Sequence, residues 1–150
     1  MLLAYRLPRE PSTPRIALWR RLRRLGSVQL LDGLVALPLD ATTREQLEWV
    51  AEDVTEGGGE ATLWIARPST VSEERALAAR MRAAIAADYG AVVEAARAAA
   101  ATDSAARRRT LRRLRSSLRA IEARDYFPPP ERDEARAEVA RLAQLVEVPG

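Results

Sequence analysis

Regular spacings of apolar residues predict short strands and amphipathic helices in the first half of the chain. Apolar and polar positions alternate in residues 2–7 and again in residues 60–67, which is typical of strands that bury one face. Between them, leucines spaced by four and three in residues 14–25 predict a helix with one apolar face, and Gly26 ends it. The two patterns together indicate a sheet that packs against helices.

The dipeptide Asp32-Gly33 lies between two apolar runs and predicts a two-residue hairpin turn. A type I′ turn requires positive φ at both central positions, and the pair Asp-Gly suits it. In that register Leu31 faces Leu34. The side chains expected under the helices are Val28, Leu30, Val35 and Leu37. The opposite face carries Leu31, Leu34 and Trp64, so we expect it to be covered by the rest of the chain or by a second subunit.

A second helix is expected between the hairpin and the last strand. Thr42 and Glu45 fit a capping box, and the glycine run at 57–59 provides the stop. The predicted order β-α-β-β-α-β is that of a ferredoxin-like domain, in which two helices cover one face of an antiparallel sheet. We therefore predict an α+β protein with a ferredoxin-like βαββαβ domain over residues 1–69. An all-helical C-terminal extension follows over residues 70–150.

Three helices are predicted in this extension. Thr70 and Glu73 form a capping pattern for the first helix, and Asp103 or Ser104 begins the second. The second helix has an apolar seam formed by Leu111, Leu114, Leu118 and Ile121. A proline run ends it, and the third helix covers residues 131–147. The seam is long enough for a helical hairpin but too short for a free coiled coil.

The composition excludes most catalytic and metal chemistry. The chain contains no cysteine and no histidine, which removes thiol nucleophiles, imidazole bases and the usual zinc, copper and haem ligands. The remaining carboxylates in the first half show no recognisable catalytic or metal-binding spacing. We therefore expect a protein that is not an enzyme, with no catalytic residue, no metal site and no cofactor.

Nothing in the sequence indicates a membrane protein. No apolar run approaches the roughly 18 residues that a membrane span requires, and the arginines near the N-terminus are unlike a signal peptide. We expect a soluble, cytoplasmic protein with no membrane partner.

Arginine supplies all 24 basic residues, against 21 acidic ones, so the net charge is only +3. Candidate contacts to a nucleic acid or another anion are Arg20, Arg21 and Arg24 in the first helix and Arg108, Arg112 and Arg115 in the arginine-rich helix. From Ser104 to Ala120 there are seven arginines and no acidic residue. Forked guanidinium groups on such a helix could contact a phosphate backbone.

Two less specific interpretations of these arginines stay open. The first is a solvated helix face, which is the simpler reading for the first helix. The second is pairing inside the molecule with the acidic last helix. The acidic residues concerned are Glu131, Asp133, Glu134 and Glu138.

Three segments resemble a known family. The run STPRIALWRRLRRLGSVQLLDGLVALP, the later GGEATLW and the distant ARDYFP are similar to the N-terminal domain of the chromate-resistance protein ChrB family. The first run matches the family pattern at Arg15, Trp19, Arg20, Leu22, Leu25, Gly26, Leu30 or Leu31, Asp32, Gly33, Leu37 and Pro38. Full-length members are described as chromate-responsive transcriptional regulators of an efflux operon.

The resemblance implies a chromate-resistance-related regulatory protein, either a transcriptional regulator or a DNA-associated module. Its partners would be DNA, chromate or another oxyanion, and further copies of itself as a dimer or other homo-oligomer. Arg15, Arg20 and Arg124 fall in the matching motifs and could hold an oxyanion. Arg15 and Arg20 could instead pair with carboxylates such as Asp125. The alternative function is a non-enzymatic oligomeric scaffold or oxyanion-binding protein with ferredoxin-like dimerisation.

Overall fold

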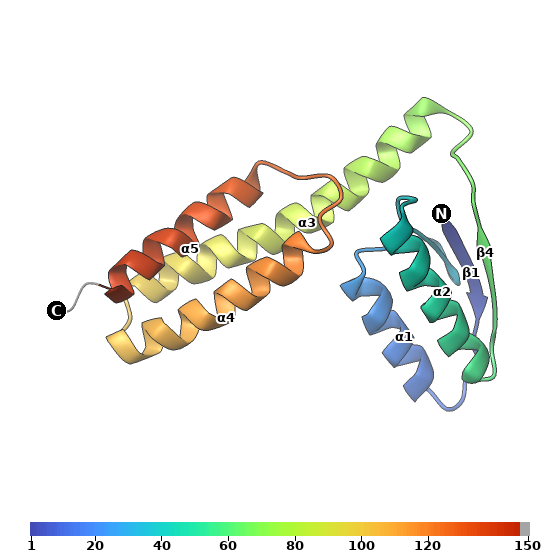
Figure 1. Cartoon of the computed structure of the whole chain (residues 1–150), viewed down its shortest axis with the longest axis horizontal. Coiled ribbons are helices and arrows are strands. Elements are labelled where there is room, and N and C mark those ends of the chain that lie inside the picture. The colour runs from blue at the N-terminus through green and yellow to red at the C-terminus, as the bar shows by residue number, and fades with distance from the viewer. Residues whose placement is uncertain (148–150) are drawn as a thin grey trace. The chain divides into compact units, whose positions relative to one another are not determined.

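The computed structural model describes residues 1–147 of the chain (Figure 1). The elements, in chain order, are β1 (Leu2–Arg6), α1 (Thr13–Arg24), β2 (Val28–Leu31), β3 (Leu34–Ala36), α2 (Ala41–Glu56), β4 (Glu60–Trp64), α3 (Val71–Ala100), α4 (Ser104–Glu122) and α5 (Glu131–Glu147). The chain divides into two compact units, unit 1 from Met1 to Met81 and unit 2 from Arg82 onward. The division falls within α3, whereas the sequence suggested a boundary in the loop just before it.

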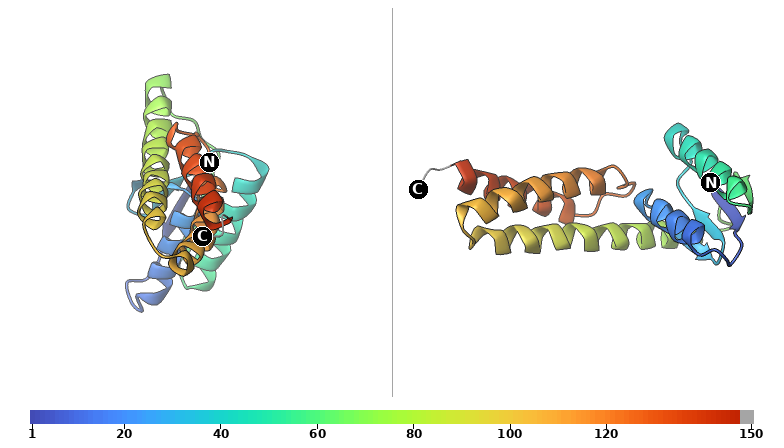
Figure 2. Two further views of the ribbon diagram at one scale, coloured as in Figure 1. Left: turned by 90° about the vertical axis from the view of Figure 1, so that its left-hand side faces the viewer. Right: turned by 90° about the horizontal axis from the view of Figure 1, so that it is seen from below.

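Unit 1 is built on a four-stranded antiparallel sheet with the strand order β2-β3-β1-β4. The central strand β1 places Leu3 opposite Val35 of β3 and opposite Leu63 of β4. Helices α1 and α2 lie side by side on one face of the sheet (Figures 1 and 2). Leu3, fully buried, lies on that covered face, which is the core of unit 1. The prediction of a mixed protein with both helices and strands is confirmed.

The hairpin turn lies at Asp32-Gly33, but it is not of the predicted type. Leu31 pairs with Leu34, as the two-residue turn requires. Gly33 has φ +73°, whereas no residue other than glycine has positive φ within the described part of the chain. Asp32 therefore has a negative φ, and the prediction of a type I′ turn is wrong. The left-handed region is energetically costly for a residue with a Cβ atom.

A bulge next to the turn changes the predicted register. Between Gln29 and Leu31 the pairing shifts by one residue, so that Gln29 and not Leu30 lies opposite Val35. Val28 pairs with Ala36, on the face opposite to Val35. The expected common face is therefore wrong for Val28, because the extra residue of a bulge reverses the alternation beyond it. Val35 is buried as predicted.

Polar side chains cap α2 and α4. Asp40 accepts a hydrogen bond from the Thr43 backbone N–H at 2.8 Å, and its own backbone N–H donates to the Thr43 hydroxyl at 3.0 Å. This capping box begins two residues before the one predicted at Thr42. Asp103 caps α4 as predicted, because its carboxylate accepts from the Ala106 backbone N–H at 2.8 Å.

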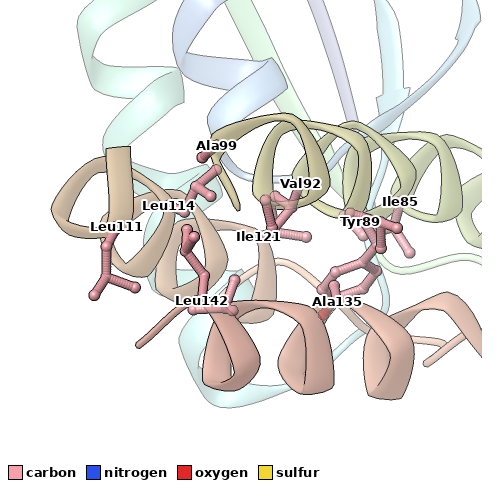
Figure 3. Packing of buried hydrophobic residues seen from close by; sticks show 12 residues of the cluster. Ile85, Tyr89, Val92, Ala99, Leu111, Leu114, Ile121, Ala135 and Leu142 are labelled. Carbon is pink, nitrogen blue, oxygen red and sulfur yellow. The ribbon is translucent and has the colours of Figure 1, made fainter. Parts of the chain in front are cut away.

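Unit 2 packs the second part of α3 with α4 and α5 around one apolar core (Figure 3). The core side chains are Ile85, Tyr89, Val92, Val93, Ala96, Ala99, Leu111, Leu114, Ile121, Ala135, Val139 and Leu142. The predicted seam of α4 supplies three of them, and its Leu118 is partly buried against the cluster. Tyr89 is completely buried within it. None of the helices within residues 1–147 combines the length and the apolar content that a membrane span needs.

The second face of the sheet is only partly covered. Trp64 is 57% exposed and Leu31 is 68% exposed, whereas Ala36 on the same face is buried. Strand β4 ends at Trp64, so Ile65, predicted to lie in the strand, lies beyond it and is 65% exposed. The apolar cover predicted for this face is therefore incomplete, and we call the part around Leu31 and Trp64 the open face.

Candidate anion-binding surfaces

One face of α4 carries a continuous row of arginines, which we call the α4 stripe: Arg108, Arg112, Arg115 and Arg119. Their spacing of four, three and four residues keeps them within about 60° of one another, because an α-helix turns about 100° per residue. Leu111 and Leu114 are buried in the core of unit 2. All four arginines are exposed.

The α4 stripe makes no ion pair with the acidic residues that were expected to neutralise it. Glu134 and Glu138 of α5 instead bind Arg97 of α3, at 2.8 and 3.4 Å. Glu122, at the end of α4, binds Arg136 at 2.6 Å. Within residues 1–147, no carboxylate lies within ion-pair distance of a stripe guanidinium, so the interpretation of internal pairing is wrong for these residues.

The neighbouring Arg107 has a structural role instead. Its guanidinium donates hydrogen bonds to the carbonyl oxygens of Ala100 at 3.1 Å, Thr102 at 2.8 Å and Leu145 at 3.1 Å. These contacts join the end of α3, the following loop and α5. The sequence placed Arg107 and Arg108 in one basic cluster, and the tertiary structure separates them.

The fold gains nothing from the charge of the α4 stripe. Arginines four residues apart repel each other by a few tenths of a kcal/mol on an exposed helix. The carboxylate of Asp103 at the N-cap compensates the positive end of the helix dipole, and Arg108 lies beyond the first turn. A polyanion placed along this face would remove the repulsion between the arginines.

The arginines of α1 do not form one surface. Arg21 makes an ion pair with Asp53 of α2, and Arg23 lies over the ring of Trp19 at 5.0 Å. Arg20 and Arg24 are exposed on the outward side of the helix, as the solvated interpretation predicts.

Arg15 lines a cleft of about 690 Å³ in unit 1. The cleft lies between the end of β1, the following loop, α1 and the hairpin turn, and its other polar side chains include Tyr5, Arg9 and Asp32. Burial raises the pKa of the Tyr5 hydroxyl, the Asp32 carboxylate raises it further, and the Arg15 guanidinium opposes the change. Tyr5 is therefore a neutral hydrogen-bond donor at ordinary pH.

Two residues of the ARDYFP segment, Arg124 and Asp125, bind side chains of α3, and we call this pair of contacts the clasp. Nη1 of Arg124 binds the Asp88 carboxylate at 2.9 Å, and the next residue, Asp125, accepts a hydrogen bond from the buried Tyr89 hydroxyl at 2.9 Å. Burial, followed by this hydrogen bond, raises the pKa of Tyr89 far above its ordinary value. Within unit 2 the partner of Asp125 is thus Tyr89. The suggested pairing of first-helix arginines with carboxylates such as Asp125 would join the two units and stays a prediction.

Within unit 1, the motif arginines Arg15 and Arg20 do not converge on one oxyanion. Arg15 and Arg20 point to different sides of α1, because five residues turn the helix by about 140°. Arg124 belongs to unit 2 and is already paired.

Sequence reasoning missed one arginine of the cleft. Arg119 of the stripe was already among the seven arginines of the predicted helix. No local signal pointed to Arg9, which the loop after β1 brings to the cleft.

The surfaces and the fold define a basic α+β protein with a separate helical unit. A family model described as "Protein ChrB, N-terminal" matches residues 15–102, from α1 to just past the end of α3. The match covers more than half of the chain, so the protein belongs to this family, which is related to chromate resistance. The resemblance seen in the sequence motifs is thereby confirmed. No curated protein and no solved structure matches the chain.

Proposed function

We propose that this protein is a DNA-associated regulatory module of the chromate-resistance type, and that the α4 stripe contacts the phosphate backbone. The observation that carries the proposal is the row of four exposed arginines without a carboxylate partner within residues 1–147. Membership of the ChrB N-terminal family supports a role in chromate resistance. The proposed role is non-catalytic, because the sequence lacks cysteine and histidine.

The geometry of the stripe suits a polyanion better than a single ion. Arg108 and Arg119 are eleven residues apart, which corresponds to about 16 Å along an α-helix. Over that length duplex DNA presents several phosphates, because it carries one charge per roughly 1.7 Å of its axis. Contacts of this kind provide affinity and position the protein, whereas base recognition requires other side chains.

The decisive experiment is a salt titration of DNA binding by fluorescence anisotropy, with a labelled duplex and the full chain. The triple variant Arg108→Gln, Arg112→Gln, Arg115→Gln should reduce the slope of log K against log salt by about 2.7, or about 0.9 for each lost phosphate contact. Its affinity at physiological salt should fall roughly tenfold or more. Its melting temperature should stay close to that of the wild type, because exposed unpaired charges contribute little to folding.

A matched control removes the same charge elsewhere. Arg67, Arg75 and Arg82 are exposed, and none of them forms an ion pair within residues 1–147. Replacing these three by Gln should leave the salt slope nearly unchanged. Equal losses in both triple variants would mean that net charge alone drives binding. A lower melting temperature with unchanged DNA affinity in the α4 variant would end the proposal.

A second candidate function, an oligomeric scaffold, is favoured by the open apolar face of the sheet. The exposed Trp64 and Leu31 both lie on that face, and a second copy could cover it as in a ferredoxin-like dimer. The antiparallel order β2-β3-β1-β4 and the element order along the chain support a ferredoxin-like topology for unit 1. Trp64→Arg should convert a dimer to a monomer in multi-angle light scattering, and an unchanged mass would contradict this function.

A further inference from the structure

The lining of the cleft of unit 1 combines basic and apolar side chains. Its basic residues include Arg9 and Arg15, and neither guanidinium has a carboxylate within ion-pair distance in the described residues 1–147. Arg6 also lines the cleft, but it is paired with Glu60 at 2.9 Å. Two unpaired guanidinium groups that border one cleft are suited to a single anionic group, which they could bind through forked hydrogen bonds.

The apolar part of the lining comes mainly from α1, the helix that also carries Arg15. Ile16 is 47% exposed and Trp19 is 52% exposed, although both are large side chains beside the cleft. Arg23 lies over the Trp19 ring at 5.0 Å and restricts its position. An exposed ring that is held in place offers a surface on which a flat apolar group can pack.

Hydrogen-bonding groups also line the cleft. Gln29 and Asp32 line the cleft and are joined by a hydrogen bond of 3.4 Å. The Tyr5 hydroxyl adds a neutral donor, and within residues 1–147 it has no hydrogen-bond partner. A few polar groups set among apolar ones are typical of sites that orient a small molecule.

The size of the cleft distinguishes between classes of anion. Its volume of about 690 Å³ lies within the range of roughly 300–1,000 Å³ found for sites of organic ligands. A tetrahedral inorganic oxyanion would occupy a small part of this space and would leave Ile16 and Trp19 exposed to water. An organic anion with an apolar body would occupy more of the cleft and would also contact Ile16 and Trp19.

We infer that this cleft is a binding site for a small organic anion with a flat apolar body. The carboxylate, sulfonate or phosphate group of the ligand binds Arg9 and Arg15, and its apolar body packs against Trp19 and Ile16. The site belongs to unit 1 and is independent of the α4 stripe, which belongs to unit 2. The inference therefore does not depend on DNA binding.

A pair of matched probes tests the basic and the apolar lining residues in the full chain. The anion 8-anilinonaphthalene-1-sulfonate and its uncharged analogue N-phenyl-1-naphthylamine share the apolar body and differ in the anionic group. Arg9→Gln combined with Arg15→Gln should weaken binding of the anion by about tenfold or more, and should change binding of the neutral analogue by less than about twofold. Trp19→Ala should weaken binding of both probes, because it removes the largest apolar side chain of the lining.

Two control variants locate the binding site. Arg75→Gln removes an exposed charge away from the cleft and should leave both affinities unchanged. Trp64→Ala removes the largest exposed side chain of the open sheet face, and it too should have no effect. Far-UV circular dichroism and the melting temperature of each variant verify its fold; Arg15 and Trp19 are exposed, so their replacement should not prevent folding.

Three results would overturn the inference. The first is unchanged binding of the anion by the double arginine variant, and the second is loss of binding in Trp64→Ala but not in Trp19→Ala. The third is displacement of the sulfonate probe by sulfate more effectively than by chloride at equal ionic strength. That result would mean that the cleft binds an inorganic oxyanion. We expect sulfate and chloride to act equally.

Discussion

Replacement of Tyr89 by Phe tests the clasp between α3 and the end of α4. Tyr89 is completely buried, and its hydroxyl donates to Oδ2 of Asp125 at 2.9 Å. The other oxygen, Oδ1, is buried and has no hydrogen-bond partner within the described residues. The tyrosine hydroxyl is therefore the donor that compensates this carboxylate, and the variant removes it without removing the ring.

The expected loss is about 2 kcal/mol in the free energy of unfolding. A hydrogen bond to a charged group contributes roughly 1.5–3 kcal/mol, and a buried acceptor left without a donor costs a similar amount. The aromatic ring stays in place in Tyr89→Phe, so little of the loss comes from a cavity. Urea unfolding followed by far-UV circular dichroism gives the value directly, and Asp125→Ala with the double variant completes a mutant cycle.

The pH dependence provides an independent measure of the same contact. Because the pKa of Tyr89 is raised in the folded protein above its ordinary value of 10.0, the unfolded chain loses this proton first as the pH increases. Above pH 10 the unfolded state therefore binds fewer protons than the folded state, and stability falls by up to about 1.4 kcal/mol per pH unit for each such tyrosine. The contribution is complete below pH 10.

In Tyr89→Phe this decline above pH 10 should be shallower. Tyr5, whose pKa is also raised, remains in the variant and accounts for part of the slope in both proteins. A loss below about 0.5 kcal/mol at neutral pH, or a coupling energy with Asp125 near zero, would refute the reasoning. Identical slopes in alkaline solution would refute it as well.

Two further substitutions have matched controls in the chain. Gly33→Ala should lower the free energy of unfolding by clearly more than Gly58→Ala, as measured by urea unfolding. Both positions have positive φ. A Cβ atom at Gly33 would collide with the carbonyl oxygen of Tyr5, whereas a Cβ atom at Gly58 would meet nothing within 4 Å. Arg107→Ala should lower the free energy of unfolding by about 1–3 kcal/mol, because three carbonyl groups lose a charged donor. The adjacent Arg108→Ala should change it by less than about 0.5 kcal/mol, and equal losses at the two positions would contradict the separation of their roles.

The sequence by itself determined the elements and the family. Apolar spacing located the helices and strands, because the side-chain period of an element depends on neighbouring residues in the chain. The same regularity placed the arginines of α4 on one exposed face. The motif residues around Arg15 and Asp32 were sufficient to recognise the ChrB N-terminal family, which the family model confirms.

The partners of individual side chains were decided by the tertiary structure. The bulge at Leu30 reversed the predicted face of Val28, since turn geometry and strand pairing must be satisfied together. Glu134 pairs with Arg97 of another helix, although α4 offers more arginines. The cleft of unit 1 likewise required the loop after β1 to bring Arg9 towards α1. Such contacts join residues far apart in the chain, and the periodicity that fixes each element carries no information about them.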